Sequence, residues 1–191
     1  LDHPCFEGRS VDLEQADAIA EALPGLLDCD ALVHAAGIMR TAPLGSLDGV
    51  AFELMWRLHV AAASQLAAGM VPAMAARGRG RVVLIGSRVS RGMAGRSQYA
   101  AVKAALVAMG RSWAAEVAAR GVTVNVVSPA ATRTAMLDDP GRAASAPRLP
   151  PRGRLIEPAE VAALVGFLLS DAAAAITGQD IQVCGGASLS G

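Results

Sequence analysis

Residues 81–85, with the sequence RVVLI, form a continuous apolar run of the kind that predicts a buried strand. A helical pattern follows over residues 99–120, and Gly121 is a residue type that commonly closes a helix. A second apolar run occupies residues 122–127 and alternates too little for a half-exposed strand. A strand, a helix and a strand in this order are typical of two parallel strands joined by a helix.

The same alternation continues outward toward both ends of the chain. Further strands are predicted at residues 4–9, 31–34 and 181–184. Further helices are predicted at residues 14–23, 48–76 and 158–170, the second of which Pro72 can kink. This order predicts one α/β domain with a mostly parallel sheet and helices on both of its faces.

Ligands of such sheets bind beyond the carboxyl ends of the strands, which gives an expected place for a functional site. Gly37, Ser87 and Pro129 each follow a predicted strand, so we expect them on one rim of the sheet. Residues 128–157 are rich in Pro, Arg and Gly and predict a long loop. Long loops in compact domains are usually functional, so we interpret this one as a flap over the site.

The amino-acid composition and net charge limit the kinds of partner that the protein can bind. The chain has 191 residues, of which 53% are hydrophobic, enough for the core of one domain and too apolar for a disordered chain. Seventeen basic and 17 acidic residues cancel, which argues against nucleic acid and anionic membranes and favours a small-molecule partner. The longest apolar stretch, residues 161–169, is about half of a membrane span, so no membrane is expected.

The three cysteines, Cys5, Cys29 and Cys184, are scattered without the short spacing of a metal site or a redox pair. Scattered cysteines of this kind are typical of reduced thiols in a cytoplasmic protein. We therefore predict a cytoplasmic protein without a bound metal.

Tyr99 and Lys103 are four residues apart on a predicted helix and so share one of its faces. Tyr99 is the only tyrosine of the chain. A nearby ammonium group favours the phenolate and brings the tyrosine pKa down from ~10 toward the range of a useful acid or base. Ser87, at the end of its strand, can bind the same substrate oxygen, although Ser90 and Ser97 are rivals. Such a trio serves carbonyl chemistry but needs a hydride carrier.

Six segments, in order along the chain, resemble the short-chain dehydrogenase/reductase superfamily in its compact single-domain form. Ser87, Tyr99 and Lys103 match its Ser, Tyr and Lys, and residues 34–37 (HAAG) resemble its Asn-Asn-Ala-Gly turn. Asp12-Leu13 resembles its adenine-contacting pair, and residues 128–134 (SPAATRT) resemble its Pro-Gly-x-x-x-Thr loop. Residues 153–162 and 176–186 are similar to its Gly-Arg…Pro-x-Glu-Val-Ala segment and its Thr-Gly-Gln…Gly-Gly ending.

The resemblance implies a Rossmann-like, doubly wound fold and an NAD(P)-dependent oxidoreductase that interconverts an alcohol and a ketone or aldehyde. It assigns Tyr99 as general acid/base, Ser87 as the residue that polarises the carbonyl, and Lys103 as the residue that lowers the tyrosine pKa and holds the nicotinamide ribose. Residues 137–152 would cover the substrate. A homodimer or homotetramer is implied, through the helices that start near Asp48 and Gln98. The implied cofactor-binding residues are Asp12, Leu13, Ala35, Ala36, Gly37, Tyr99, Lys103, Pro129, Ala130, Thr132 and Thr134.

The family's first two strands and its glycine-rich phosphate-binding turn would precede Leu1. We expect that those residues exist in the natural protein, because the family's first strand is central and pairs with its fourth. The residue that separates NAD from NADP would also precede Leu1, so the prediction is NAD or NADP without distinction. Three further departures are His34 for asparagine, Ala130 for glycine, and His59 where an asparagine often anchors a water; His59 can equally be a packing residue.

Alternatives stay open at this point. Arg88, Arg91 and Arg96 crowd the segment before Tyr99 and would either recognise an anionic substrate or form solvated ion pairs. The chain could also be a non-catalytic binding or assembly subunit, which the missing phosphate cradle favours and the intact Ser-Tyr-Lys set opposes. A nucleotide-sugar epimerase or dehydratase is a weaker alternative, because the Gly185-Gly186 ending leaves no room for a substrate domain.

Overall fold

The computed structural model describes residues 5–140 and 148–189, which share one four-stranded parallel sheet. Its strands are β1 (Ala31–His34), β2 (Gly80–Ile85), β3 (Val122–Pro129) and β4 (Asp180–Val183), in the order β1-β2-β3-β4. Leu32 pairs with Val82, and Val82 pairs with Val124. The prediction of a Rossmann-like α/β fold with a mostly parallel sheet is confirmed.

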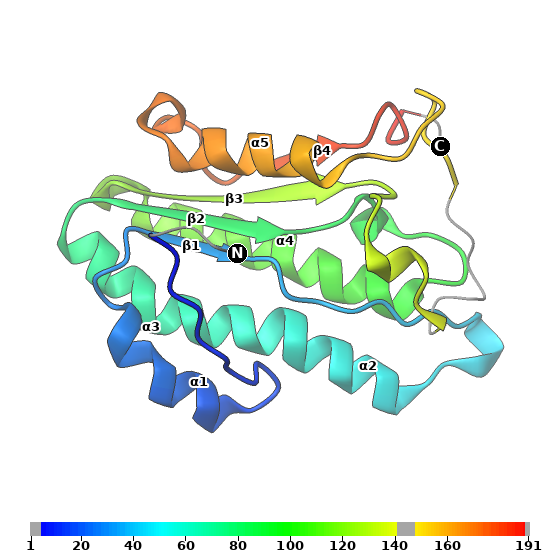
Figure 1. Cartoon of the computed structure of the whole chain (residues 1–191), viewed down its shortest axis with the longest axis horizontal. Helices are drawn as coiled ribbons and strands as arrows, with labels where there is room; N and C mark the ends of the chain where they lie inside the picture. The colour runs from blue at the N-terminus through cyan, green and yellow to red at the C-terminus, as the bar shows by residue number, and fades with distance from the viewer. Residues whose placement is uncertain (1–4, 141–147, 190–191) are drawn as a thin grey trace.

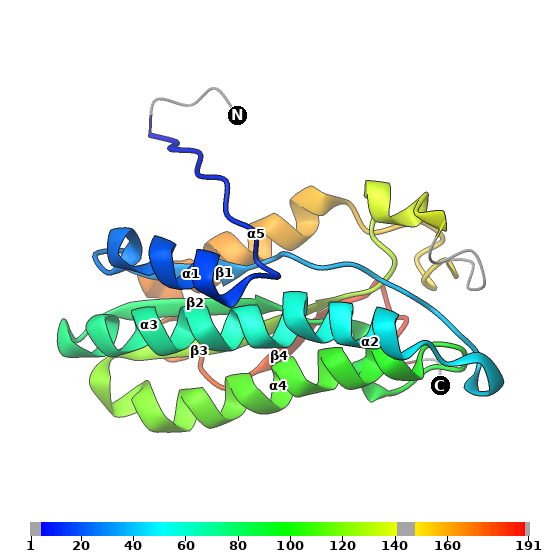
Figure 2. The ribbon, with the colours of Figure 1, turned by 90° about the horizontal axis from the view of Figure 1, so that it is seen from below.

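Helices cover both faces of the sheet (Figures 1 and 2). One face carries α1 (Ala16–Ala22), α2 (Gly49–Trp56), α3 (Ala62–Ala76) and α4 (Ser97–Val117), and the other carries α5 (Pro158–Leu169). The short 3-10 turns are η1 (Leu23–Leu26), η2 (Leu44–Ser46), η4 (Arg88–Arg91), η5 (Ala118–Arg120), η6 (Ala135–Leu137) and η8 (Asp171–Ala173).

Alternate residues of the central strands face opposite layers, as the pleat of a strand requires. Leu84 and Val126 belong to the core that packs against α3 and α4. Val83 and Val127 belong to a separate core that includes Leu168 of α5. Because both faces are covered, β2 and β3 are buried at nearly every position, including the polar residues Thr123 and Asn125 of β3.

The helical stretch 49–76 is interrupted by a π-helical turn, η3 (Arg57–Ala61), and not at Pro72. Asp48 caps its start, because the Asp48 carboxylate accepts hydrogen bonds from the backbone N–H groups of Val50 and Ala51. The stretch is long and apolar enough to span a membrane, but half of its most apolar window is buried inside the protein. That degree of burial is typical of a core helix packed against a sheet.

The predicted strand at residues 4–9 is wrong for the described residues 5–9, which form no strand. Phe6 is 54% exposed, so the apolar residues of this segment do not contribute to the core. A segment becomes a strand only when a neighbouring strand satisfies its backbone groups, and residues 5–9 pair with none of the four strands. Other differences, such as a helix that begins at Ala16 instead of residue 14 and one that ends at Val117 instead of residue 120, are shifts of one to three residues.

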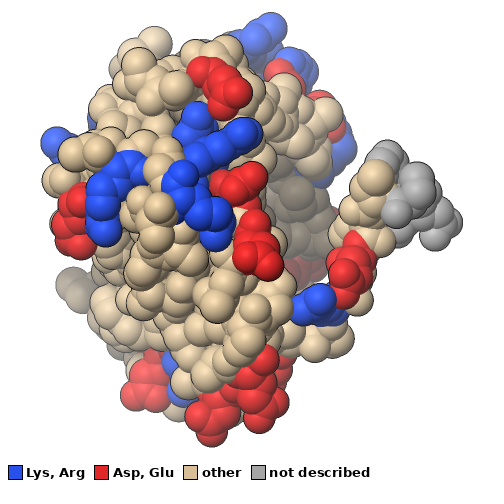
Figure 3. All heavy atoms as spheres, turned by 90° about the vertical axis from the view of Figure 1, so that its left-hand side faces the viewer, with Lys and Arg blue, Asp and Glu red and all other residues tan. Residues whose placement is uncertain are grey.

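The face at the amino ends of the strands carries basic and acidic side chains next to one another (Figure 3). Nη2 of Arg77 lies 3.7 Å from Oδ1 of Asp30, and Nη2 of Arg81 lies 3.3 Å from Oδ1 of Asp171. Arg81 is only 7% exposed, and its guanidinium also donates to the carbonyl of Gly80 at 2.9 Å. These contacts tie the ends of strands and helices together at this face.

Candidate active site

A cavity of about 610 Å³ opens at the carboxyl ends of the strands. Gly37, Ser87 and Pro129, which follow or end β1, β2 and β3, all line it. The prediction that these three residues share one rim is therefore confirmed. Tyr99 and Lys103 line the same cavity from α4.

Ser87 reaches the cavity because β2 ends at Ile85 and the chain turns directly into η4. Its backbone is extended and its hydroxyl oxygen accepts a hydrogen bond from the N–H of Val89 at 3.2 Å. The residue is 8% exposed and lines the cavity, whereas neither Ser90 nor Ser97 does. The hydroxyl hydrogen of Ser87 is thus available to a ligand oxygen, and the geometry favours Ser87 over its two rivals.

Tyr99 and Lys103 are stacked one helical turn apart near the start of α4, both buried at 7% and 4% exposure. The Lys103 ammonium lies 5.8 Å from the centroid of the Tyr99 ring and donates a hydrogen bond to the carbonyl of Ile85 at 2.7 Å. Burial lowers the pKa of Lys103 from its ordinary value to about 7. The amine is therefore a titrating group near neutral pH, placed beside the phenol.

His59 lies in the π turn and is 1% exposed. Its Nε2 lies 2.8 Å from the carbonyl oxygen and 3.1 Å from the amide nitrogen of Ile38, and its ring meets the Tyr99 ring edge-on with centroids 6.0 Å apart. Among the described residues, its buried Nδ1 has no hydrogen-bond partner. Burial, followed by the charge of Lys103, lowers the pKa of His59 to about 3, so the imidazole is neutral at working pH.

His34 ends β1 and is 3% exposed. Burial and the charge of Lys103 lower its pKa, although the backbone carbonyls of Leu58 and His59 oppose this shift. Those carbonyls belong to the π turn, so His34 links the end of the strand to that turn. Two neutral imidazoles therefore lie close enough to Lys103 to feel its charge.

The loop after β3 is fixed by backbone bonds on two sides. The N–H of Ala130 donates to the carbonyl of Val183 at 3.1 Å, and the N–H of Arg133 donates to that of Ile156 at 2.9 Å. The Thr132 hydroxyl donates to the carbonyl of Ala130 at 3.0 Å. Thr132 and Thr134 line the cavity, so this loop presents its threonines from a well-supported backbone.

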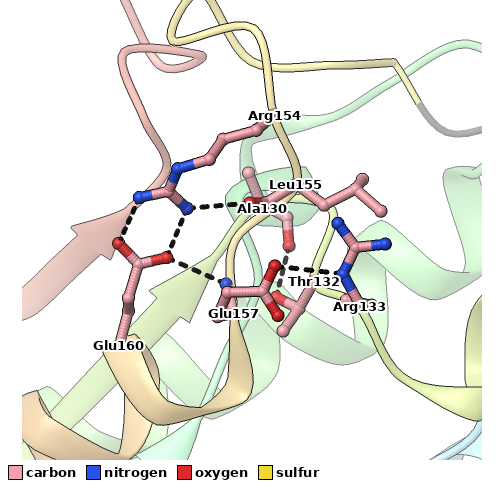
Figure 4. A network of polar contacts seen from close by, with 7 residues as sticks. All are labelled: Ala130, Thr132, Arg133, Arg154, Leu155, Glu157 and Glu160. Carbon is pink, nitrogen blue, oxygen red and sulfur yellow. Dashed lines mark hydrogen bonds and ion pairs between the residues drawn. The ribbon is translucent and has the colours of Figure 1, made fainter.

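A charged network supports the same loop from the start of α5 (Figure 4). Arg154 holds Glu160 through two hydrogen bonds of 2.7 and 2.9 Å, and Glu160 in turn accepts the N–H of Glu157 at 2.9 Å. Glu157 caps α5 and also accepts from Nε of Arg133 at 3.0 Å. The hydrogen bond from Arg154 lowers the pKa of Glu160 to about 2, so the Glu160 carboxylate is charged at neutral pH.

A family model described as enoyl-(acyl carrier protein) reductase matches residues 10–188 of the chain. The chain is 35% identical over 188 residues to the 3-oxoacyl-(acyl-carrier-protein) reductase FabG of Vibrio cholerae, covering 94% of this chain and 77% of that protein. It is 40% identical over 168 residues to FabG of Haemophilus influenzae, with 85% and 69% covered. A solved structure of a short chain dehydrogenase/reductase family protein matches with a TM-score of 0.86 at 37% identity, over 94% of this chain and 75% of that one. The chain belongs to the short-chain dehydrogenase/reductase family.

Membership makes this short-chain dehydrogenase/reductase an NAD(P)-dependent oxidoreductase that acts on an alcohol or keto group. The predicted family and reaction class are therefore confirmed. Among the described residues, no three His, Cys, Asp or Glu side chains are grouped so as to hold a metal ion.

The structure places the other predicted site residues in two groups. Ala35, Ala130, Arg88 and Arg96 line the cavity of the dehydrogenase/reductase, and Arg88 also donates to the carbonyl of Ala187 at 3.1 Å. The predicted residues that do not line it are Asp12, Leu13, Ala36 and Arg91. Asp12 instead accepts the N–H of Glu14 at 2.9 Å, just before α1. Of the predicted substrate cover, residues 141–147 lie outside the described residues.

Substitution of Gly37 by alanine is expected to disturb both stability and the site. A methyl group on Gly37 would overlap the buried His59 ring, which cannot move without pressing on Tyr99. We expect the free energy of unfolding to fall by about 1–3 kcal/mol, as for other overpacked positions. Gly45→Ala is the matched control, because a methyl group there meets nothing within 4 Å. Denaturant unfolding of both variants measures the difference; equal stability would show that the ring is free to move.

Sequence reasoning missed part of the cavity wall. Met39, Met93 and Met136 line the cavity from three separate segments. An ion pair of 2.7 Å between Arg40 and Asp139 joins two of those segments. The only available signal was that each methionine falls in a loop at the carboxyl end of the sheet, and a single methionine in a loop predicts nothing.

Proposed function

We propose that the cavity is the catalytic site for reduction of a ketone, or oxidation of the corresponding alcohol, with Ser87, Tyr99 and Lys103 as its working residues. The observation that carries this proposal is that all three line one cavity, at the strand ends where α/β sheets bind ligands. Ser87 and Tyr99 would both hydrogen-bond the substrate oxygen. Tyr99 would give a proton to that oxygen during reduction and take it back during oxidation.

Lys103 supports this role through its charge and its remaining donors. An ammonium beside a phenol favours the phenolate, so Lys103 would help Tyr99 to give up and take back its proton. An ammonium has three N–H donors, so the bond to Ile85 leaves two for ligand hydroxyl groups. Because burial lowers the pKa of Lys103 to about 7, its charge would respond to what binds beside it.

The residues around the cavity fit a nicotinamide dinucleotide, which supplies the hydride when it is bound. Small residues at the end of β1, Ala35 and Gly37, leave the cavity open, and Thr132 and Thr134 offer hydroxyl groups from the supported loop. Four more residues of the proposed cofactor-binding set also line the cavity: Tyr99, Lys103, Pro129 and Ala130. The set further includes three residues that do not line it: Asp12, Leu13 and Ala36. We keep NAD and NADP as equal candidates.

For the substrate, we propose a 3-oxoacyl thioester, the class named in the curated relatives. The support is the sequence likeness together with a largely apolar cavity that continues from Tyr99. A purely binding or assembly role is disfavoured, because a binding module has no use for a buried lysine held beside a tyrosine. The single sheet supports the further proposal that residues 1–191 form one Rossmann-fold domain.

The proposal also covers the oligomeric state of the protein and its location in the cell. Val50 and Trp56 on α2 are 76% and 42% exposed, which leaves apolar side chains on a helix predicted to meet a second copy. We propose a homodimer or homotetramer, which size-exclusion chromatography with light scattering would measure. Cys29 and Cys184 are free thiols, which supports a cytoplasmic setting.

The direct test is oxidation of NADPH or NADH by the purified protein with a 3-oxoacyl thioester, followed by the loss of reduced-nicotinamide absorbance. We expect turnover that depends on both substrates and stereospecific formation of the 3-hydroxy product. If the protein binds NADPH or NADH but shows no turnover with the dinucleotide that it binds, a catalytic role is refuted.

A further inference from the structure

Three methionines form one side of the cavity, and nothing in the proposed chemistry of Ser87, Tyr99 and Lys103 uses them. Met39 comes from the segment after β1, Met93 from the segment between η4 and α4, and Met136 from η6. We refer to Met39, Met93 and Met136 as the methionine wall. The sequence contains seven methionines, so close to half of them gather at this one surface.

The methionine wall is continuous with the proposed catalytic tyrosine. Met39 and Tyr99 belong to one buried apolar cluster, against which Met93 and Met136 are packed. Met39 is 4% exposed and therefore forms the fixed base of the wall, whereas Met93 and Met136 are half-buried. An apolar group attached to a carbonyl that is held by Tyr99 would thus have methionine side chains within the same cavity to pack against.

Two of the three segments that carry the wall are tied to each other. Nη1 of Arg40, next to Met39, forms an ion pair of 2.7 Å with Oδ2 of Asp139, close to Met136. The N–H of Arg40 also donates to the sulfur of Met55 at 3.4 Å. These contacts hold the segments that carry Met39 and Met136 next to each other.

Methionine has properties that select a particular kind of ligand. Its side chain is unbranched, has three rotatable bonds and a polarisable sulfur, and offers no hydrogen-bond donor. Such a surface adapts to a flexible hydrocarbon and gives a polar group nothing to bind.

We propose that the methionine wall binds an unbranched hydrocarbon chain on the substrate carbonyl and sets the order in which the enzyme prefers chain lengths. The proposal rests on the proposed function for the position of the carbonyl. It adds that Met93 and Met136 determine specificity, acting on the chain and not on the reacting atoms.

The test is calorimetric binding of 2-alkanones of increasing chain length to the purified protein, with and without saturating NAD⁺ or NADP⁺. Burial of each added methylene should tighten Kd about three- to fourfold until the wall is filled. In the double variant Met93→Gln/Met136→Gln, which keeps side-chain length and adds a polar amide, Kd should change less than about 1.5-fold per methylene. Met93→Leu/Met136→Leu should restore the dependence, which a merely structural defect of the Gln variant would not predict.

Met109→Ala is the matched control, because Met109 packs against the same cluster but does not line the cavity. It should keep the wild-type dependence on chain length. A wild-type Kd that ignores chain length, or an unchanged dependence in the Gln double variant, would overturn the proposal. If the ketones bind in the expected order of chain length but are never reduced, the proposed function is refuted and the role of the methionine wall is not. If the protein turns over ketones with no preference for chain length, the role of the methionine wall is refuted and the proposed function is not.

Discussion

Tyr99→Phe is expected to lower kcat about 10²- to 10⁴-fold, the range associated with loss of a positioned general acid or base. The change removes one oxygen atom and keeps the ring, which packs in the buried cluster with Met39 and meets His59 edge-on. The dinucleotide should still bind, because most of the proposed cofactor-binding residues lie elsewhere on the rim. Steady-state kinetics and dinucleotide titration on the same preparation measure both effects.

Ser97→Ala is the matched control for Tyr99→Phe, since Ser97 begins the same helix but is exposed and does not line the cavity. It should leave kcat within about twofold of wild type. Near-normal turnover by Tyr99→Phe would remove the tyrosine from the mechanism. A matching loss of dinucleotide affinity would instead identify it as a binding residue.

Lys103→Met is expected to lower kcat/KM about 10²-fold, because the phenol loses the cation that favours its ionised form. The same substitution should also change how stability depends on pH. The ordinary pKa of 10.5 applies to Lys103 in the unfolded chain, whereas burial lowers it to about 7 in the folded protein. Between these values the unfolded chain holds a proton that the folded protein has released, so the free energy of unfolding should rise with pH.

Denaturant unfolding at pH 7 and pH 9.5 tests this linkage. The wild-type protein should be more stable at the higher pH by a few kcal/mol, at about 1.36 kcal/mol for each unit of pKa difference. Lys103→Met should lose most of that increase and be more stable than wild type near pH 7, where the charged amine is costly to bury. Lys103 is the only lysine of the sequence, so its pKa can also be read from a single ¹⁵N-lysine signal. A measured pKa near 10.5 would contradict the account.

Local physical rules account for what the sequence could predict. Strands such as β2 are visible because a strand buried on both faces must be apolar along its length, and the Tyr99–Lys103 pair is visible because helical spacing alone brings the two together. Residues 5–9 do not form the predicted strand because pairing depends on a neighbour, which local sequence does not specify. The methionine wall could not be predicted because three distant segments must fold before Met39, Met93 and Met136 share one surface.

Histidine marks a second limit on prediction. From the sequence, His59 could equally be a packing residue or a site residue. Its role depends on a π turn that no local sequence pattern predicts. The structure places its ring beside Tyr99 and leaves its Nδ1 without a hydrogen-bond partner among the described residues. Burial, which decides that this imidazole stays neutral, is a property of the folded protein.

The π turn also makes the active site sensitive to the number of residues in one helix. A π turn holds one residue more than an α turn, so residues on either side of Arg57–Ala61 are offset by about 100° relative to a regular helix. Deleting a single residue there would allow an unbroken helix to form and would turn the position of His59 away from Ile38. A one-residue insertion or deletion can therefore remodel this site between related chains in which every aligned side chain is the same.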